Sequence, residues 1–315
     1  MRQFIIEPYA GLANRLRVLL SAQRLAEMTN RALAVVWLPH KGCGCQYSDL
    51  FENEIQQVDS GDLSDVSSSE IVRISKNDTH HLFSEAPVVY CRSCHILGKP
   101  GEFPYGVFTK LAPYFNRLKP IRWIQEAVDA CVANRFRSHM LGVHVRRGDR
   151  VDKKIREQGL IGTVSDLFFK EVDRYLRDWP EAAIFLATDD GAPTERFEKY
   201  TYRPEGLVRE FTERYGTKLV IYKKRTLDRA DVTGVQDALI DLLLLNNTNF
   251  VFGSAGSSFS QFAIMRNLES RKTMRRCLRM VGGRINIPRI RPLAARMAAR
   301  IRNFSLRWRP RRTWR

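Results

Sequence analysis

One stretch of the sequence combines residue types that could bind an anion at the end of a strand. It reads Leu141-Gly-Val-His-Val-Arg-Arg-Gly-Asp149, a short apolar run that turns into a cluster of charged residues. Because side chains alternate along a strand, His144 and Arg146 lie on the same face. The guanidinium groups of Arg146 and Arg147 can hold a phosphate or carboxylate through paired N–H donors. The alternative is a strand end whose arginines form surface ion pairs.

A loop of small residues further along the chain could complete such a site. The segment Ser254-Ala-Gly-Ser-Ser-Phe-Ser260 offers backbone N–H groups and hydroxyls in front of a helical pattern, where anions are favoured. With Arg146 it would form a diphosphate clamp that needs no metal, although ordinary N-capping also explains the serines. The sequence contains neither G-x-x-x-x-G-K-[ST] nor G-x-G-x-x-G, so ATPase and dinucleotide-binding functions lose their usual support.

Strand and helix patterns alternate along the chain and must position these residues. The pattern predicts an α/β fold with parallel sheets, in which ligands bind at the carboxyl ends of the strands. The N-terminal unit is a β-α-β pattern with Gly11 in its first crossover turn. We predict strands at 3–9, 32–38, 86–91, 141–146, 182–187, 218–222 and 249–253, and helices at 12–26, 48–52, 121–136, 165–179, 194–200 and 235–247.

Two further predictions concern single residues in this pattern. Ser165 is a candidate N-cap for the helix that Pro180 stops. His80 and His81 are adjacent, so we interpret them as surface residues whose side chains diverge.

The two β-α units predict two Rossmann-like domains facing across a cleft, with a basic C-terminal tail. The predicted ranges are 1–136, 137–270 and 271–315.

The positive charge of the chain is a property of its C-terminal tail. The net charge is +18, but residues 271–315 contain 16 of the 52 Lys and Arg residues and no acidic residue. The rest of the chain is nearly neutral, with 36 basic and 34 acidic residues. An apolar stripe at helical spacing runs through the arginines, which predicts an amphipathic helix at a membrane surface; a nucleic-acid-binding tail and a solvated tail are the alternatives. The stripe consists of Leu293, Met297, Ile301, Phe304 and Trp308.

The cysteines allow one metal hypothesis. Cys43, Cys45, Cys91 and Cys94 could converge on a structural zinc ion, because paired thiolates at short spacing are zinc ligands. C-x-C is not the usual zinc spacing, so reduced and partly buried thiols are favoured.

No run approaches the ~20 apolar residues of a membrane helix, and the N-terminus lacks signal-peptide features. We therefore expect a cytoplasmic protein that contacts the inner membrane peripherally.

Four stretches together resemble the GDP-fucose-dependent fucosyltransferases. The likeness is to the α-1,6 (nodulation and core) and α-1,2 branches, including bacterial members, and it covers roughly residues 3–268. Of the four, the H-x-R-R-x-D block is the most specific. The stretches are Gly11-Leu-Ala-Asn-Arg15, Gly142-Val-His-Val-Arg-Arg-Gly-Asp149, Leu186-Ala-Thr-Asp-Asp190 and Gly256-Ser-Ser-Phe-Ser260, with additional likeness at Trp37 to Cys43 and Ser48-Asp-Leu-Phe51.

The resemblance implies a GT-B-like fold and an inverting transfer of L-fucose from GDP-fucose to a glycan hydroxyl. It implies neither a metal nor another cofactor, with GDP-fucose as the donor substrate. By position, Arg146 would contact the β-phosphate and stabilise the departing GDP. His144 and Asp241 would line the guanine pocket, although Asp241 could also be a polar position on an apolar helix. The other donor-binding positions would be Gly11, Asn14, Arg15, Arg147, Ser257 and Ser258.

The sequence departs from the α-1,6 branch where a general base is expected. About ten residues after the histidine that branch has a glutamate, whereas Lys153 and Lys154 stand here. A base must still accept the proton of the acceptor hydroxyl. Asp149 and Asp152 are the candidate catalytic carboxylates, with Glu157 nearby. Two alternative functions remain open: transfer from another sugar nucleotide, and a catalytically degenerate protein that binds a membrane or nucleic acid through its tail.

Overall fold

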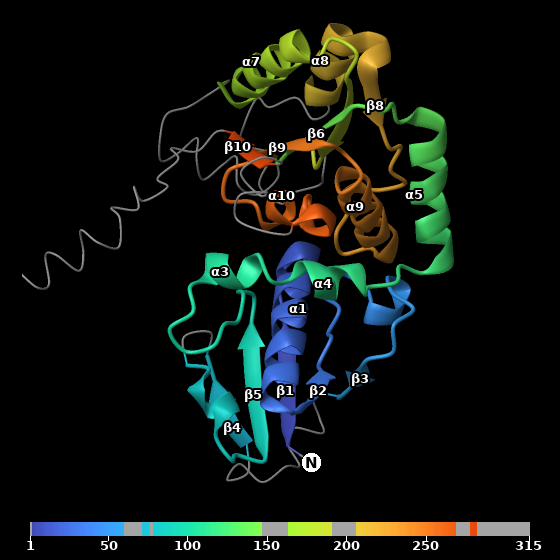
Figure 1. Ribbon diagram of the computed structural model, residues 1–315. Helices are drawn as coiled ribbons and strands as arrows, with labels where there is room; N and C mark the ends of the chain where they lie inside the picture. The colour runs from blue at the N-terminus through green and yellow to red at the C-terminus, as the bar shows by residue number, and fades with distance from the viewer. Residues whose placement is uncertain are drawn as a thin grey trace, which may run out of the picture. The chain divides into compact units, whose positions relative to one another are not determined.

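The protein has an α/β fold with two parallel sheets, as the sequence predicts (Figure 1). The computed structural model describes residues 2–59, 71–75, 78–146, 163–190, 206–268 and 278–281. The predicted helix 194–200, most of the polar segment 59–70 and nearly all of the basic tail therefore lie outside the described residues. Residues 1–282 form one compact unit.

The first sheet has five parallel strands in the order β3-β2-β1-β5-β4. Its strands are short and mostly apolar, except β3, which is a pair of exposed glutamines, and they pair around the central β1, which contacts both β2 and β5. The strands are β1 (Gln3–Pro8), β2 (Ala32–Val35), β3 (Gln56–Gln57), β4 (Ile71–Ile74) and β5 (Val88–Ser93). The helices of this part are α1 (Leu12–Thr29), α3 (Pro104–Phe108) and α4 (Ala112–Asn116), with the 3-10 helices η1 (Tyr47–Asp49) and η2 (His80–Phe83). Helix α5 (Arg122–Arg135) lies instead beside the second sheet, where Arg135 donates a 2.7 Å hydrogen bond to the Ile221 carbonyl oxygen (Figure 1).

The second sheet also has five parallel strands, in the order β10-β9-β6-β7-β8. Every residue of β6 and β7 is buried, which explains why both strands read as continuous apolar runs. The strands are β6 (Met140–Val145), β7 (Ala183–Thr188), β8 (Leu219–Ile221), β9 (Phe250–Ser254) and β10 (Leu278–Val281). The helices are α7 (Thr163–Asp178), α8 (Gly206–Tyr215), α9 (Val232–Leu245) and α10 (Ser258–Phe262), with the 3-10 helices η4 (Gly216–Lys218) and η5 (Met265–Asn267).

The main hydrophobic core contains residues that lie far apart in the chain. It joins α1 and the segment around α3 and α4 to α9 and α10. The ring of Phe262 packs edge-on against Phe108 and Phe115, with centroids 5.6 and 6.1 Å apart. Gly44 is required where its turn meets the segment before α9, because a Cβ there would lie 1.8 Å from the carbonyl oxygen of Ala230. The same turn donates a hydrogen bond from the Gly44 amide to the Arg229 carbonyl at 2.8 Å.

Several predicted element boundaries differ from the structure. Ser165 is not an N-cap, because α7 begins two residues earlier at Thr163. Helix α8 was not predicted, and β10 lies within residues that the sequence assigns to the tail. Strand β10 is short, and Arg279 in its middle pairs with Glu171 of α7 at 2.9 Å, so part of the tail's charge belongs to the second sheet. The domain boundaries at 136 and 270 remain predictions.

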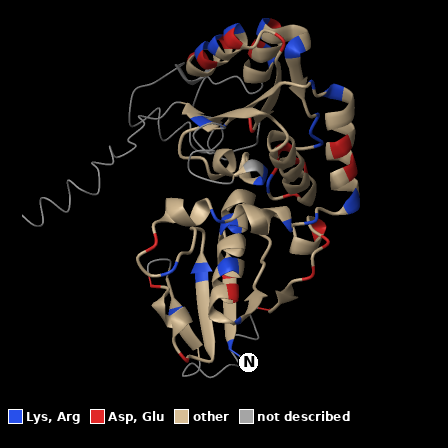
Figure 2. Cartoon of the chain, viewed as in Figure 1, with Lys and Arg blue, Asp and Glu red and all other residues tan. Residues whose placement is uncertain are grey.

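Charged residues of both signs are interspersed over the surface helices (Figure 2). Helices α5, α7 and α8 each carry basic and acidic side chains, in agreement with the nearly neutral composition outside the tail. Ion pairs along or between these helices include Arg122–Glu126 at 2.8 Å and Arg209–Glu213 at 3.7 Å. In the part of the chain that the structure describes, no helix is both long enough and apolar enough to cross a membrane.

Candidate functional site

The carboxyl edge of the second sheet gathers the polar residues that the sequence singles out. Strands β6, β7 and β9 are parallel neighbours, with His144 paired in register to Ala187 and Gly253. Their carboxyl ends therefore meet at one edge. The residues brought together there are His144 and Arg146 after β6, Asp189 and Asp190 after β7, and the loop Ser254–Ser258 after β9.

Arg146 is fixed by its backbone and directs a half-buried side chain to the sheet edge. Its amide donates a 2.8 Å hydrogen bond to the Ser254 hydroxyl, which joins the ends of β6 and β9. Its guanidinium Nε lies 4.0 Å from the nearer carboxylate oxygen of Asp189, and the side chain is 21 % exposed. The guanidinium thus combines a defined position with access from solvent, as a binding group for an oxyanion requires.

His144 is a buried, neutral histidine. Its Nδ1 lies 2.6 Å from the hydroxyl of Ser260, and its ring stacks on Phe259 with centroids 4.8 Å apart. Burial lowers the pKa of His144 to about 3, against a smaller opposing effect of Asp189. Gly253 permits the close contact, because a Cβ at that position would lie 2.5 Å from the Cβ of Ser260. His144 is therefore suited to hydrogen bonding and packing rather than to carrying charge at neutral pH.

Asp241 on α9 is paired with a lysine that sequence reasoning missed. Lys224 follows β8, and its Nζ lies 2.7 Å from Asp241 Oδ2 and 3.0 Å from the Thr188 carbonyl oxygen. Burial raises the pKa of Asp241 to about 6, and Lys224 limits that rise. Among the described residues, Oδ1 of Asp241 is buried and has no hydrogen-bond donor. A buried carboxylate oxygen of this kind is costly unless a donor reaches it.

The serine loop has one side chain engaged in capping. Ser257 is the N-cap of α10, and its hydroxyl accepts from the Ser260 amide at 3.5 Å, as the capping alternative predicts. The Ser257 side chain is buried, whereas Ser258 is partly exposed. Gly256 adopts a φ of 72°, which a residue with a side chain rarely adopts and which turns the loop toward α10. Phosphate binding by Ser257 or Ser258 stays a prediction.

The predicted residues of the first sheet serve the structure of the turn after β1. Arg15 is fully buried, donates to the carbonyl oxygens of Ala10 and Leu38 at 3.1 and 2.5 Å, and lies over the ring of Trp37. Asn14 accepts a 2.6 Å hydrogen bond from Arg17 through its side-chain oxygen. Gly11 precedes α1 and its carbonyl accepts the first helical hydrogen bonds. These contacts give Gly11, Asn14 and Arg15 a structural role in the turn after β1. Binding of a nucleotide by these three residues stays a prediction.

The acidic residues after β7 have separate tasks. Asp190 is 4 % exposed, and its Oδ2 accepts a 2.9 Å hydrogen bond from the Leu207 amide at the start of α8. Asp189 instead faces Arg146. Asp190 therefore holds a helix in place while Asp189 faces the site. The other charged candidates, Arg147, Asp149 and Asp152, lie outside the described residues, as does Glu157.

The cysteines agree with the hypothesis of reduced thiols. Cys43, Cys45, Cys91 and Cys94 are free, and the first three are buried. The sulfur atoms of Cys43 and Cys45 lie 3.9 Å apart, but within the described ranges the four cysteines do not form a cluster of metal ligands. Burial raises the pKa of Cys91 to about 12, which keeps that thiol protonated.

Comparison with known proteins gives structural but not sequence matches. No family model matches the chain, and no curated protein matches it. The structure of NodZ α-1,6-fucosyltransferase soaked with GDP-fucose is 19% identical and covers 84% of this chain and 92% of its own, with a TM-score of 0.55. A second NodZ structure comes from Bradyrhizobium. Arabidopsis thaliana FUT1 in complex with GDP is 15% identical, covering 84% of this chain and 68% of that chain, with a TM-score of 0.54.

A third fold relative is POFUT1. Its apo form is 10% identical, covers 90% of this chain and 98% of its own, and has a TM-score of 0.56. The chain therefore has the fold of fucosyltransferases that use GDP-fucose.

Proposed function

We propose that the protein transfers L-fucose from GDP-fucose to a hydroxyl of a glycan, with inversion and without a metal ion. One observation carries this proposal: Arg146, His144 and Asp241 gather around the carboxyl edge of a sheet in a chain with this fold. The edge offers a cation for a diphosphate and an unpaired carboxylate oxygen for a base. A NodZ structure soaked with GDP-fucose supports the choice of donor.

The leaving group would be stabilised by Arg146. Transfer breaks the bond between the sugar and the β-phosphate, so negative charge develops on the departing GDP. The Arg146 backbone is held at the strand end by its hydrogen bond to the Ser254 hydroxyl, so its guanidinium is placed where it can neutralise that charge. Arg147 and the hydroxyls of Ser257 and Ser258 are proposed as further phosphate contacts.

Asp241 would select guanine among the bases. Guanine presents two adjacent N–H donors on one edge, and a carboxylate is the matching acceptor. Oδ2 of Asp241 is held by Lys224, which leaves Oδ1 for a ligand. Neutral His144, stacked on Phe259, would form part of the wall of the same pocket.

Acceptor activation requires a general base, for which Asp149 and Asp152 are our candidates. Either carboxylate would remove the proton of the attacking hydroxyl as the bond to the fucose carbon forms. His144 is unsuited to this step, because its pKa of about 3 makes it a weak base. A panel of glycan acceptors would identify the acceptor and the linkage formed.

The proposal predicts fucose transfer that survives a chelator. Incubation of full-length protein with GDP-fucose and a panel of glycan acceptors should release GDP and yield a fucosylated product. The rate should change less than about twofold in EDTA, because arginine supplies the charge that a metal would otherwise supply. Loss of turnover in EDTA, restored by Mn²⁺ or Mg²⁺, would instead assign Asp189 to a metal. Turnover with another sugar nucleotide alone would overturn the choice of donor.

The C-terminal tail is proposed as a membrane-surface anchor. The tail, residues 271–315, contains 16 Lys and Arg residues and no acidic residue, with eleven of the arginines in 283–315, and the apolar stripe from Leu293 to Trp308 runs through them. Each basic residue near an anionic leaflet contributes about 1 kcal/mol, and the attraction weakens with salt. Anchoring would bring the enzyme to a lipid-linked or envelope glycan on the cytoplasmic side of the inner membrane.

Co-sedimentation with vesicles tests the anchor. Full-length protein should sediment with anionic vesicles at moderate ionic strength and much less with neutral ones. A full-length variant with Arg296, Arg300, Arg302 and Arg307 changed to Gln should lose most of this binding. A matched control changes four arginines of the body, Arg122, Arg137, Arg177 and Arg209, to Gln and should sediment as the wild type does. Equal binding by the tail variant, or a shift of RNA without vesicle binding, would refute the anchor.

A further inference from the structure

Three side chains on one turn of the first sheet present metal-ligand atoms to one another. Nδ1 of His80 lies 2.7 Å from Oδ1 of Asp78, and Nε2 of His81 lies 4.0 Å from Oδ2 of the same carboxylate. The three ligand atoms lie within 4.8 Å of one another. The prediction that the two histidine side chains diverge is wrong. The 3-10 geometry of η2 holds the two imidazole rings close together, with centroids 4.5 Å apart.

We propose that Asp78, His80 and His81 bind a divalent transition-metal ion of the zinc type. Ligands at about 2.1 Å around a tetrahedral ion lie roughly 3.4 Å from one another, so small side-chain rotations would bring these donors onto one ion. Two imidazoles and one carboxylate favour Zn²⁺, Cu²⁺ or Ni²⁺ over Ca²⁺ and Mg²⁺, which prefer all-oxygen sites. Three protein ligands leave one position for water.

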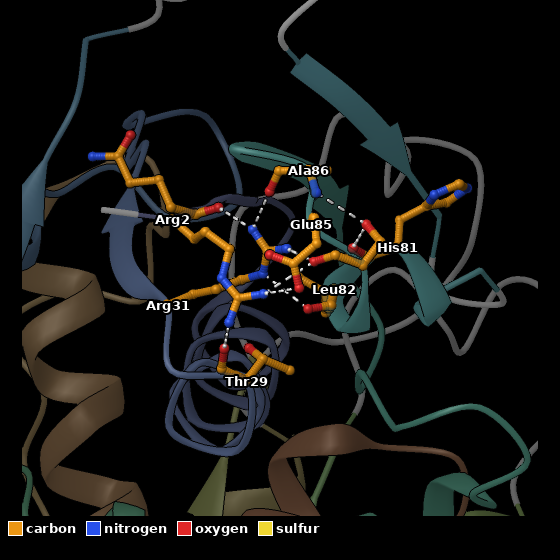
Figure 3. A network of polar contacts seen from close by, with 9 residues as sticks. Arg2, Thr29, Arg31, His81, Leu82, Glu85 and Ala86 are labelled. Carbon is orange, nitrogen blue, oxygen red and sulfur yellow. Dashed lines mark hydrogen bonds and ion pairs between the residues drawn. The ribbon is translucent and has the colours of Figure 1, made fainter.

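The backbone of the turn is held independently of any metal. Arg31 is 5 % exposed and donates to the carbonyl oxygens of Leu82, Ser84 and Ala86 at 2.9, 2.7 and 2.7 Å. Figure 3 shows this network, in which Arg2 adds contacts to Thr29 and Glu85 while the imidazole of His81 points away from the arginines.

The residues next to the proposed ligands are anchored as well. Thr79 donates its hydroxyl to the Gly98 carbonyl at 2.5 Å, and the Leu82 side chain is completely buried. The ligands therefore project from a fixed frame, which reduces the entropy lost when a metal binds.

The location separates this site from the donor site. Arg31 also donates to the Gln3 carbonyl at 3.4 Å, where β1 begins, and Ala86 lies just before β5. The turn thus lies at the amino ends of the strands of the first sheet, whereas Arg146 follows the carboxyl end of β6 in the second. A metal here would stabilise the first sheet and would take no part in fucose transfer.

The test is metal binding by full-length protein without a histidine tag. After treatment with a chelator and its removal, titration with Co²⁺ should give visible absorption bands of a nitrogen- and oxygen-ligated ion. Calorimetry with Zn²⁺ should show one equivalent bound through these ligands. His80→Ala, His81→Ala and Asp78→Asn should each weaken binding at least tenfold. His139→Ala is the matched control, because it removes a histidine of the second sheet and should bind as the wild type does.

A thermal scan in EDTA distinguishes ligand loss from misfolding. Because Thr79, Leu82 and Arg31 hold the turn, the His80→Ala and His81→Ala variants should unfold at the wild-type temperature in EDTA. Only wild type and His139→Ala should gain stability with Zn²⁺. Failure of wild type to bind Co²⁺ or Zn²⁺, unchanged binding in both histidine variants, or a thiolate-to-Co²⁺ charge-transfer band that a Cys43→Ser change removes would overturn the proposal.

Discussion

Replacing Arg146 with alanine should lower the rate of fucose transfer by about 10²–10³, the usual effect of removing a group that stabilises developing charge. The substitution removes the guanidinium near Asp189 but keeps the backbone hydrogen bond from residue 146 to Ser254, so the strand end should stay in place. Arg146→Lys should recover little of the lost rate, because an ammonium cannot form the paired hydrogen bonds of a guanidinium. The measurement is GDP release under saturating donor and acceptor.

The matched control for this experiment is Arg137→Ala. Arg137 is exposed, donates to the Thr217 carbonyl and precedes β6 rather than following it. This variant removes the same charge from the same half of the chain and should transfer fucose at the wild-type rate. Unfolding temperatures of both variants show whether a loss of activity reflects chemistry. Transfer by Arg146→Ala within a few-fold of wild type would remove Arg146 from the proposed mechanism.

The strands and the main helices could be predicted from the sequence because their signal is local. A buried parallel strand appears as a short apolar run, and β6, β7 and β9 are such runs. The sheet edge then follows from parallel topology, which is why His144, Arg146 and the serine loop were expected together. Strand β10 escaped prediction because its four residues include Arg279, whose charge is compensated by Glu171 on another helix.

The contacts between site residues could not be predicted, since they depend on packing between distant segments. Ser260 lies 116 positions after His144, and only the folded chain shows that its hydroxyl meets the imidazole. Lys224 is one of two adjacent lysines after β8, and no local pattern tells which one reaches Asp241. The structure shows Lys224 partly buried and Lys223 exposed.

Affinity for GDP should depend on pH through Asp241. Burial raises the pKa of this carboxyl from 3.8 to about 6, so the group protonates in the folded protein as the pH falls through about 6. Only the ionised carboxylate accepts both N–H donors of guanine, so GDP affinity should fall up to tenfold per pH unit below that value. Because the folded pKa lies above the unfolded value of 3.8, the contribution of this group to stability is fully present below about pH 3.8 and is lost as the pH rises from there to about 6.

Two substitutions test the contributions of Asp241 and Lys224 to GDP binding separately. Asp241→Asn should weaken GDP binding about 10–100-fold at pH 7.5, the range expected for hydrogen bonds to a charged group, and should reduce the preference for GDP over ADP. Lys224→Met removes the cation that lowers the pKa of Asp241, so the midpoint of GDP binding should move above pH 6. Affinity in this variant should recover as the pH is raised to 8 or 9.

Lys223→Met provides the control, because Lys223 is the exposed neighbour of Lys224 and loses the same charge. The GDP affinity of Lys223→Met, and the pH midpoint at which that affinity changes, should match those of the wild type in calorimetric titrations between pH 5 and 9. An affinity that does not change between pH 5 and 8 in the wild type would show that Asp241 does not bind the base. A midpoint that stays near pH 6 in Lys224→Met would show that Lys224 does not control the ionisation of Asp241, whatever binds the base.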